Sequence, residues 1–305
     1  ENQFFDRGEV AKSYSGFEPR VSLRYSLDDN TSLKASYNRM RQYVQLISNT
    51  TAALPTARWG TSDVNIQPQI ADQVSVGIFK NLEENKWETS AELYYRKSQQ
   101  FPDYRDLADL IFSSNLEQEI IQGKGRAYGL ELMARKNTGF MTGWLTYTYA
   151  RTQVKIDPRY ELIHNYTGAW YPANYDKPHT FNLMVNYRTA INVTLSGNFT
   201  LSTGRPATYP IGSFVASGNT VPIFPNRNLQ RIPNYHRLDL ALIIEPNPNR
   251  ARKWQGSWIL SVYNLYSRNN AYSVYFDLNP RLQTNAYKLA VFGAAFPSIT
   301  YNFKF

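Results

Sequence analysis

The sequence of 305 residues contains no cysteine, only three histidines and no run of about 18 apolar residues. Without cysteine, the chain can form neither a disulfide scaffold nor a structural zinc site. Without a long apolar run, and with a mean hydropathy of −0.49, the sequence does not resemble a helical membrane protein. The absences exclude three classes: disulfide-rich domains, structural zinc domains and helical membrane proteins.

Motifs that carry catalysis or bind cofactors are also missing. His164, His179 and His236 have no His or Cys partner at the spacing of metal ligands, so we predict no metal site. There is no Gly-x-Ser-x-Gly motif and no recognisable frame of Ser, His and Asp. The glycine-rich residues 123–129 lead into a strand rather than a helix, which favours close packing or a kink over phosphate binding. These missing motifs do not exclude catalysis, but they leave no candidate catalytic residue, and we predict no cofactor.

The acidic stretch DYRDLAD allows two interpretations. Asp103, Asp106 and Asp109 are spaced so that a short helix could gather their carboxylates and attract calcium. A solvated helical turn with Leu107 and Leu110 packed beneath it fits the same residues. We favour the helical turn.

Aromatic residues, by contrast, make up 15% of the chain, with 23 tyrosines and 16 phenylalanines. Tyrosine and tryptophan settle at membrane–water interfaces because one end of each side chain is apolar and the other forms hydrogen bonds. The formal net charge is +9, but the basic residues are scattered rather than clustered, so we expect no nucleic-acid partner. The aromatic surplus points to a membrane instead.

Alternation of apolar and polar residues, which is typical of β-strands, recurs along the whole chain. In residues 191–202, Val193 and Leu195 face one way, while Asn192 and Thr194 face the other. Eleven segments show this alternation: 20–27, 32–39, 72–80, 86–97, 125–136, 143–155, 179–188, 191–202, 235–244, 257–266 and 298–305. The sequence therefore predicts an all-β fold.

The connections between these segments alternate in length. Short turns are predicted at residues 28–30, 81–85, 136–140 and 189–190, and an intermediate one at 245–255. Long links are predicted at residues 41–70, 100–122, 156–177, 204–234 and 267–297. Short turns at one edge and long loops at the other are typical of an antiparallel transmembrane β-barrel.

The polar faces of the predicted strands carry many charges, and a small barrel filled by side chains has little space for them. We expect six of these residues to line a wide lumen: Arg24, Glu92, Glu131, Arg135, Arg237 and Asp239. Each strand is about ten residues long, enough to cross an apolar band of roughly 25 Å.

Bacterial single-chain barrels have even strand numbers, so eleven strands imply a missing partner upstream of Glu1. We expect residues 1–305 to be the C-terminal part of a single barrel domain, the C-terminal half of one with about 22 strands around a plug. Residues 1–16 would then be the end of a preceding loop.

Six stretches together resemble the C-terminal barrel of TonB-dependent receptors of the Bacteroidetes type. They are GKGRAYGLELMARKNTGFMTGWLTYTYARTQ (123–153), YPANYDKPH (171–179), TGRPATYP (203–210), RNLQRIPNYHRLDLAL (227–242), SVYNLYSRNNAYSVYF (261–276) and PSITYNFKF (297–305). The resemblance runs from about residue 17 to residue 305. Each stretch alone is weakly specific, so the resemblance depends on the order in which the six stretches follow one another.

The resemblance implies active uptake across the bacterial outer membrane by a barrel with a plug domain, energised by the TonB complex through a short N-terminal segment. The resemblance therefore implies a transporter and not an enzyme. Neither plug nor TonB-binding segment is in this sequence. Outer-membrane lipid and lipopolysaccharide would surround the barrel, and a surface lipoprotein is a further expected partner. The family's last strand also resembles an assembly signal, which falls here on Tyr301, Phe303 and Phe305; the same residues could simply face lipid at the periplasmic aromatic girdle.

A ligand would bind in the long loops and upper lumen. Flat rings bury sugar or peptide surface with little loss of entropy, although an aromatic belt would use the same residues. The candidate ligand-binding residues are Trp59, Trp170, Tyr171 and Tyr175, with Arg205 and Arg231 for an anionic group, for lipopolysaccharide or for a neighbouring loop.

Three functions fit the sequence. The first is TonB-dependent uptake of a bulky nutrient: a glycan, a peptide or an iron chelate. The second is a structural or docking barrel for surface lipoproteins or secretion machinery. The third is a soluble, secreted β-sandwich that binds carbohydrate, which would bury its apolar stripes against each other.

Overall fold

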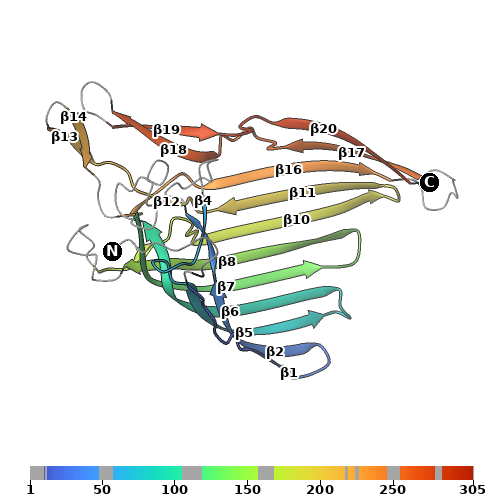
Figure 1. Cartoon of the computed structure of the whole chain (residues 1–305). Coiled ribbons are helices and arrows are strands. Elements are labelled where there is room, and N and C mark those ends of the chain that lie inside the picture. The colour runs from blue at the N-terminus through green and yellow to red at the C-terminus, as the bar shows by residue number, and fades with distance from the viewer. Residues whose placement is uncertain are drawn as a thin grey trace.

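The computed structural model describes residues 10, 12–47, 58–104, 119–156, 168–216, 219–223, 227–245, 255–278 and 284–304. Eleven long strands form one antiparallel sheet in which nearly every strand pairs with its neighbours in sequence order (Figure 1). Within these ranges, no helix is long and apolar enough to cross a membrane. The long strands are β1 (Arg20–Ser26), β2 (Thr31–Gln42), β5 (Gln69–Leu82), β6 (Trp87–Tyr104), β7 (Ile120–Lys136), β8 (Met141–Ile156), β10 (His179–Ala190), β11 (Val193–Ser202), β16 (Tyr235–Ile244), β17 (Gln255–Tyr263) and β20 (Phe296–Lys304).

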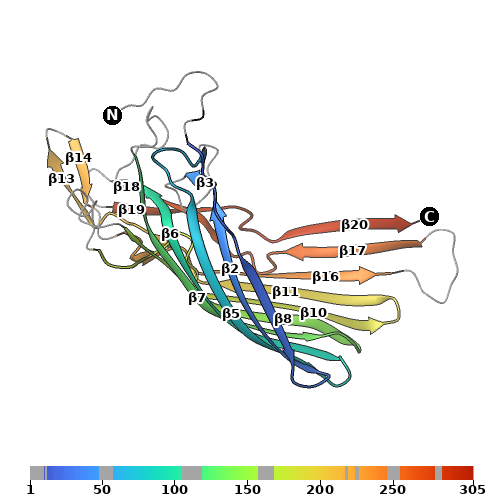
Figure 2. The same ribbon diagram turned by 60° about the horizontal axis from the view of Figure 1, so that its bottom comes forward.

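The sheet curves into an open trough, and its two ends differ (Figures 1 and 2). The short turns lie at one end together with the C-terminus, and the long links lie at the other (Figure 1). Each of the eleven predicted strands corresponds to one strand of this sheet, so the all-β prediction is confirmed.

The structure differs from the prediction in strand length. Strands β5 to β8 have 14, 18, 17 and 16 residues rather than about ten, because pairing continues into the segments predicted as long links. Strand β17 ends at Tyr263, three residues early, because Asn264 and Ser267 adopt left-handed backbone conformations with φ of 54° each.

The long links also contain strands that the alternation did not predict. Four short antiparallel pairs form there: β3 (Val44–Ile47) with β4 (Arg58–Thr61), β12 (Pro206–Ala207) with β15 (Gln230–Arg231), β13 (Gly212–Ala216) with β14 (Asn219–Ile223), and β18 (Ala271–Leu278) with β19 (Thr284–Ala290). A further two-residue strand, β9 (Tyr171–Pro172), extends the main sheet beside β8.

The register of the sheet gathers the apolar stripes on one face. Residues directly opposite each other on antiparallel strands point to the same side. One such row runs across the first five strands through Val21, Tyr37, Val74, Tyr95 and Tyr128. We call this side of the sheet the apolar face.

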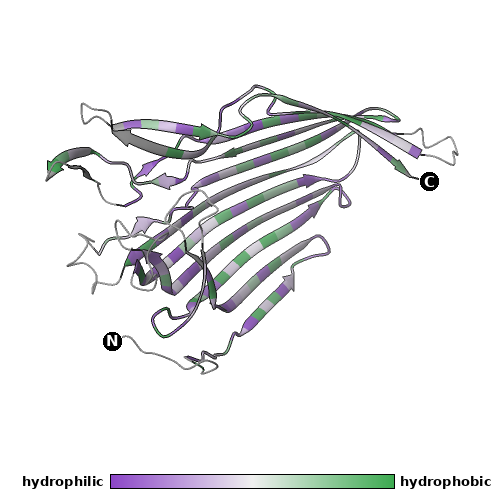
Figure 3. Cartoon of the chain, turned by 45° about the horizontal axis from the view of Figure 1, so that its top comes forward, coloured by the Kyte–Doolittle hydropathy of each residue, from purple (hydrophilic) through white to green (hydrophobic). Residues whose placement is uncertain are grey.

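The apolar face continues to the other edge, where Leu242, Leu260 and Ile299 lie opposite one another. Val74 is 50% exposed and Ile299 is 70% exposed. Hydropathy alternates along the strands as this arrangement requires (Figure 3). A continuous exposed surface of this kind is stable only against an apolar environment.

The six charged residues predicted to line a lumen lie on the opposite face, out of step with the apolar rows by one position. On that face, Arg237 forms an ion pair with Asp239 at 2.8 Å. Glu92 lies directly opposite Glu131, a contact between like charges that water screens readily. That this polar face encloses a water-filled lumen stays a prediction.

The last strand lies against β17 with its aromatic side chains on the apolar face. Tyr301 packs on Trp258 with ring centroids 4.6 Å apart, and the Phe303 ring lies 6.3 Å from that of Tyr301. Phe305 lies outside the described residues. This packing suits a lipid-facing girdle, and the role of these residues as an assembly signal stays a prediction.

The glycines of residues 123–129 lie where neighbouring atoms leave no room for a side chain. A Cβ atom at Gly123 would lie 2.3 Å from the carbonyl oxygen of Lys155. At Gly129 it would lie 2.5 Å from the carbonyl oxygen of Tyr149 and 2.8 Å from the ring of Tyr94. These contacts support close packing, rather than phosphate binding, as the reason for the glycines.

Gly129→Ala should therefore destabilise the barrel by about 1–3 kcal/mol, because overpacking forces backbone and ring to move. Gly197→Ala is the matched control, since its Cβ would meet only the flexible Leu240 side chain at 3.4 Å. Thermal unfolding of the full-length protein in detergent measures both variants. Equal melting temperatures would contradict this account of the glycines.

Candidate functional site

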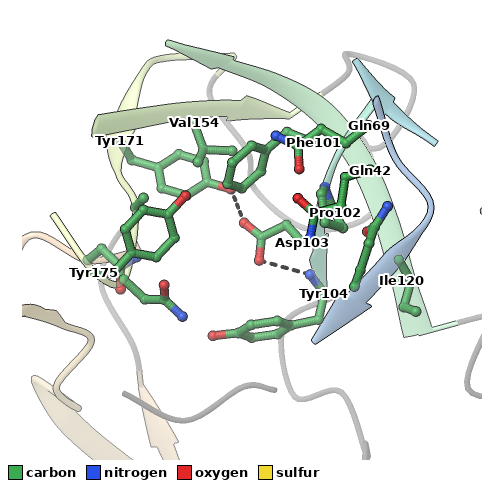
Figure 4. A pocket seen from close by; sticks show the side chains of 14 residues that line it. Gln42, Gln69, Phe101, Pro102, Asp103, Tyr104, Ile120, Val154, Tyr171 and Tyr175 are labelled. Atoms are coloured by element: carbon green, nitrogen blue, oxygen red, sulfur yellow. Dashed lines mark hydrogen bonds between the residues drawn. The ribbon is translucent and has the colours of Figure 1, made fainter. Parts of the chain in front are cut away.

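A pocket of about 250 Å³ lies at the long-loop end of the sheet, beside β6, β8 and β9 (Figure 4). Among the residues that the structure describes, its lining is rich in amides and aromatic rings and includes one carboxylate but no lysine or arginine. The amides belong to Gln42, Gln45, Gln69, Asn174 and Asn228, the rings to Phe101, Tyr104, Tyr171 and Tyr175, and the carboxylate to Asp103.

A β-bulge in β6 builds one wall of this pocket. Gln100 has a positive φ of 50°, and the pairing with β7 shifts between Gln99 and Phe101. Before the bulge, odd-numbered side chains of β6 lie on the apolar face; after it, Phe101 and Asp103 lie on the polar face. One extra residue therefore brings the carboxylate into the pocket.

The wall rests on a small apolar core at the end of the sheet. Ile121, Val154, Ile156 and Ala173 are buried there, and Phe101 and Tyr171 pack against them. This core fixes the positions of Phe101 and Tyr171, two of the four rings of the pocket. Its burial offsets the entropy lost in ordering the ends of the long links.

Asp103 is the point at which three segments meet. Its carboxylate accepts a hydrogen bond from the Tyr171 hydroxyl and one of 2.9 Å from Nη1 of Arg227. Arg227 also donates to the carbonyl oxygen of Tyr104 at 2.8 Å, and its guanidinium lies 3.9 Å from the Tyr104 ring centroid. The side chains of Arg227 and Asp103 are only 9% and 12% exposed. The charge of Asp103 is thus neutralised within the protein.

These contacts correct the interpretation of the acidic stretch in part. Asp103 belongs to strand β6 rather than to a helical turn, and it binds an arginine. Asp106, Leu107, Asp109 and Leu110 lie outside the described residues. In the part of the chain that the structure describes, no three acidic or histidine side chains form a metal-binding group.

A second buried carboxylate, that of Asp176, holds the loop that precedes β10. It accepts a hydrogen bond of 2.6 Å from the Thr152 amide, forms an ion pair with Arg231 and lies 3.6 Å from Nε of Arg151. Arg231 also donates to the carbonyl oxygens of Asp176 and Gly204 at 2.8 and 3.0 Å. An anionic group, lipopolysaccharide and a neighbouring loop were the predicted partners of Arg231. The structure shows contacts with the neighbouring loop.

Arg205 lies in the next loop and donates to the carbonyl oxygen of Tyr272 at 2.8 Å. Burial, and to a smaller extent the charge of Arg205, lowers the pKa of the nearby Lys177 amine. Neither cation belongs to the lining of the pocket.

The aromatic candidates separate into two groups. Tyr171 and Tyr175 line the pocket (Figure 4). Trp170 instead packs over the guanidinium of Arg126, 4.3 Å from the ring centroid, on the apolar side of the wall. Trp59, on β4, is 71% exposed and does not belong to the lining. A role of any of these residues in ligand binding stays a prediction.

Sequence reasoning missed the amides, and Gln45 is the most informative of them. It is only 3% exposed, and neither polar atom of its side chain has a hydrogen-bond partner in the described structure. A buried amide without partners costs free energy, about 1–3 kcal/mol for each unsatisfied group. Apart from its position within the predicted long link 41–70, nothing in the sequence marks this residue.

Asp103→Asn should destabilise the protein by about 3 kcal/mol, because it leaves the buried Arg227 without its counter-charge. Glu83→Gln is the control: its ion pair with Lys86 is exposed, and exposed pairs contribute about 0–1 kcal/mol. Thermal unfolding of the full-length protein in detergent reports both changes. If the two variants unfold at the same temperature, Asp103 does not hold the pocket together.

The sequence and the fold both resemble those of known proteins. The family model described as TonB dependent receptor-like, beta-barrel, matches residues 2–265. A comparison with curated protein sequences finds no match. The chain spans about a third of the length of the solved structures that it resembles.

Three of these structures show the likeness. The ferric-catecholate import receptor Fiu of E. coli K12 has a TM-score of 0.57 at 15% identity, over 93% of this chain and 34% of its own. The ferripyoverdine receptor of the outer membrane of Pseudomonas aeruginosa has a TM-score of 0.55 at 13% identity, over 95% and 33%. BauA, the ferric preacinetobactin receptor of Acinetobacter baumannii, has a TM-score of 0.55 at 13% identity, over 94% and 36%.

At these identities the structural likeness concerns the fold, whereas the family model covers most of the sequence. The all-β sheet, its single apolar face and the match over residues 2–265 agree with one another. The chain belongs to the β-barrel family of TonB-dependent receptors and is part of a protein of the bacterial outer membrane.

Proposed function

We propose that this chain forms the C-terminal half of the barrel of a TonB-dependent transporter, which takes up a bulky nutrient through that plugged barrel. The observation that carries the proposal is the pocket at the long-loop end. It lies on the polar side of the wall, behind a surface that requires lipid. A transporter needs this arrangement, because the substrate must be bound inside the barrel and not on its outside.

The chain's own contribution is binding rather than covalent chemistry. The carboxylates of Asp103 and Asp176 hold β9 and the loop before β10 in place, so the amides and rings of the pocket are positioned in advance. The plug domain and the segment that contacts the TonB complex would belong to other parts of the protein. Energised rearrangement of the plug would then release the substrate towards the periplasm.

The lining favours one kind of substrate among the glycans, peptides and iron chelates. Amides offer donors and acceptors together, and tyrosine rings cover flat faces of a ligand. Among the described residues of the lining there is no lysine or arginine, and the guanidinium of the neighbouring Arg227 is already paired with Asp103. A neutral ligand rich in hydroxyl or amide groups fits this lining best.

A second function, docking of a surface lipoprotein, is favoured by a separate observation. The β13–β14 hairpin and the segments beside it expose large apolar side chains at the long-loop end: Ile211 (67%), Phe214 (49%), Val215 (59%), Ile223 (43%) and Leu229 (60%). Exposed apolar surface outside the membrane often marks a protein interface. The two functions are compatible, since a lipoprotein could deliver substrate to the pocket.

Tyr175→Ala should reduce uptake about tenfold by weakening substrate binding, since its ring lines the pocket and is 54% exposed. Trp170→Ala is the matched control, because this ring lies on the other side of the wall. Growth of strains that carry the full-length variants is measured on oligosaccharides, peptides and ferric chelates as the limiting nutrient, at equal protein levels in the outer membrane.

Deletion of the TonB protein should abolish growth on the same nutrient. If no nutrient depended on both this receptor and TonB, transport would be the wrong function and docking would stand. If the Tyr175 and Trp170 variants grew equally, the pocket would not be the binding site.

A further inference from the structure

The amides that line the pocket differ in how far their hydrogen bonds are already used. Nδ2 of Asn228 donates to the carbonyl oxygen of Pro172 at 2.9 Å, and Nε2 of Gln42 donates to that of Val44 at 2.9 Å. Gln45 belongs to the same lining, but neither the oxygen nor the nitrogen of its side chain has a partner in the described part of the chain. The hydrogen-bonding groups of Gln45 are therefore free for a ligand.

The strand pairing explains why Gln45 lacks a partner. Gln45 lies on β3 directly opposite Gly60 of β4, and opposed residues point to the same side. Glycine has no side chain that could bind the amide. The neighbours along the strand, Val44 and Leu46, are apolar and point to the other side. Since Gln45 is only 3% exposed, water does not replace the missing partners.

For folding alone, an apolar residue would suit the position of Gln45 better. A buried amide gives up its hydrogen bonds to water on folding, and without partners in the protein it regains none of them. Methionine has the same unbranched length and carries no such penalty. Native proteins leave few buried polar groups without partners, so each one calls for a physical reason. Beside a pocket, that reason is the binding of a ligand.

A side-chain amide selects for a particular arrangement of groups on its ligand. It presents an acceptor oxygen and a donor nitrogen side by side. Two hydroxyl groups on neighbouring carbons of a sugar ring match this pair, because one donates to the oxygen while the other accepts from the nitrogen. The N–H and C=O of one trans peptide group point to opposite sides, so a single peptide group cannot pair with both atoms.

The rest of the lining agrees with a sugar. The rings of Tyr171 and Tyr175 border the pocket (Figure 4), and flat rings cover the apolar faces of a ligand. The hydroxyl of Tyr171 donates to Asp103, which fixes this ring before a ligand arrives. Among the described residues of the lining there is no lysine or arginine, which suits an uncharged ligand.

We propose that Gln45 sets the specificity of the pocket by binding two neighbouring hydroxyl groups of a saccharide, one at its side-chain oxygen and one at its nitrogen. A rotation about the bonds of the side chain turns the amide towards the ligand. Because water has little access to this position, both hydrogen bonds are stronger than they would be at the surface. The inference rests on the proposed function, since it takes the pocket as the binding site of the transported nutrient.

The test uses the full-length protein in detergent and measures binding of 1→4-linked hexasaccharides of glucose, mannose, galactose or xylose, whose 2- and 3-hydroxyls are free. Gln45→Met should weaken binding of the tightest hexasaccharide about tenfold, because two hydrogen bonds are lost. The same variant should melt at a higher temperature without ligand, because the buried amide is gone.

Gln73→Met is the matched control for both measurements. Gln73 precedes Val74 of the apolar face, so it lies on the polar face of the same wall, and it does not belong to the lining of the pocket. Both the affinity and the melting temperature of this variant should equal those of the unmodified protein.

Deoxy forms of the tightest hexasaccharide identify the group that Gln45 binds. The 2-deoxy and 3-deoxy forms each lack one of the two neighbouring hydroxyls and should bind the unmodified protein more weakly. Because the lost hydroxyl no longer meets Gln45, Gln45→Met should weaken binding of these forms by only about threefold or less. Fully additive losses would mean that the hydroxyls bind elsewhere, and they would overturn the proposal.

The remaining outcomes separate this inference from the proposed function. An unchanged affinity of Gln45→Met, or a lower melting temperature, would overturn the inference, because the amide would then not serve binding at its own cost in stability. Failure of all four hexasaccharides to bind, or tighter binding of a neutral hexapeptide that depends on Gln45, would also overturn it. The transport function is decided separately by growth of the TonB deletion, and it stands if a nutrient depends on both this receptor and TonB.

Discussion

The register between neighbouring strands is the constraint on which the rest of the structure depends. Directly opposed residues share a face, so a slip of one position would move every apolar side chain of a strand to the polar side. The register of the main sheet shifts at Gln99/Phe101 and at Arg188/Ala190. Both shifts lie beyond the apolar rows that hold Tyr37, Tyr95 and Ile299, so these rows stay on one face. The backbone hydrogen bonds of the sheet and the lipid-facing surface are therefore specified together, and neither is stable without the other.

The pocket forms where this regularity is broken. The bulge at Gln100 exchanges the two faces of β6, and only beyond it do Phe101 and Asp103 enter the pocket. Once there, Asp103 can hold Arg227 and Tyr171, which come from segments far away in the sequence. A regular strand would have left the same carboxylate beside the lipid, where an unpaired charge is costly.

Alternation was enough to predict the strands and their two faces, because burial against lipid repeats every two residues. It could not predict what single long-range contacts decide. Arg231 is held by Asp176, 55 residues earlier, and no local pattern reveals that pair. The amides that line the pocket lie at the ends of β2 and β5 or within the long links, beyond the alternating segments, so Gln45 went unnoticed. Trp170 and Tyr171 were grouped as rings, although neighbouring residues of a strand point to opposite sides.

The opposite orientation of Trp170 and Tyr171 has a structural consequence. The indole of Trp170 touches Arg126 on the membrane side, while the hydroxyl of Tyr171 holds Asp103 on the inner side. Adjacent residues share one planar peptide unit, so both contacts belong to the same short stretch of backbone. At this position the barrel wall is therefore fastened on both of its faces, to Arg126 on the outer side and to Asp103 on the inner side.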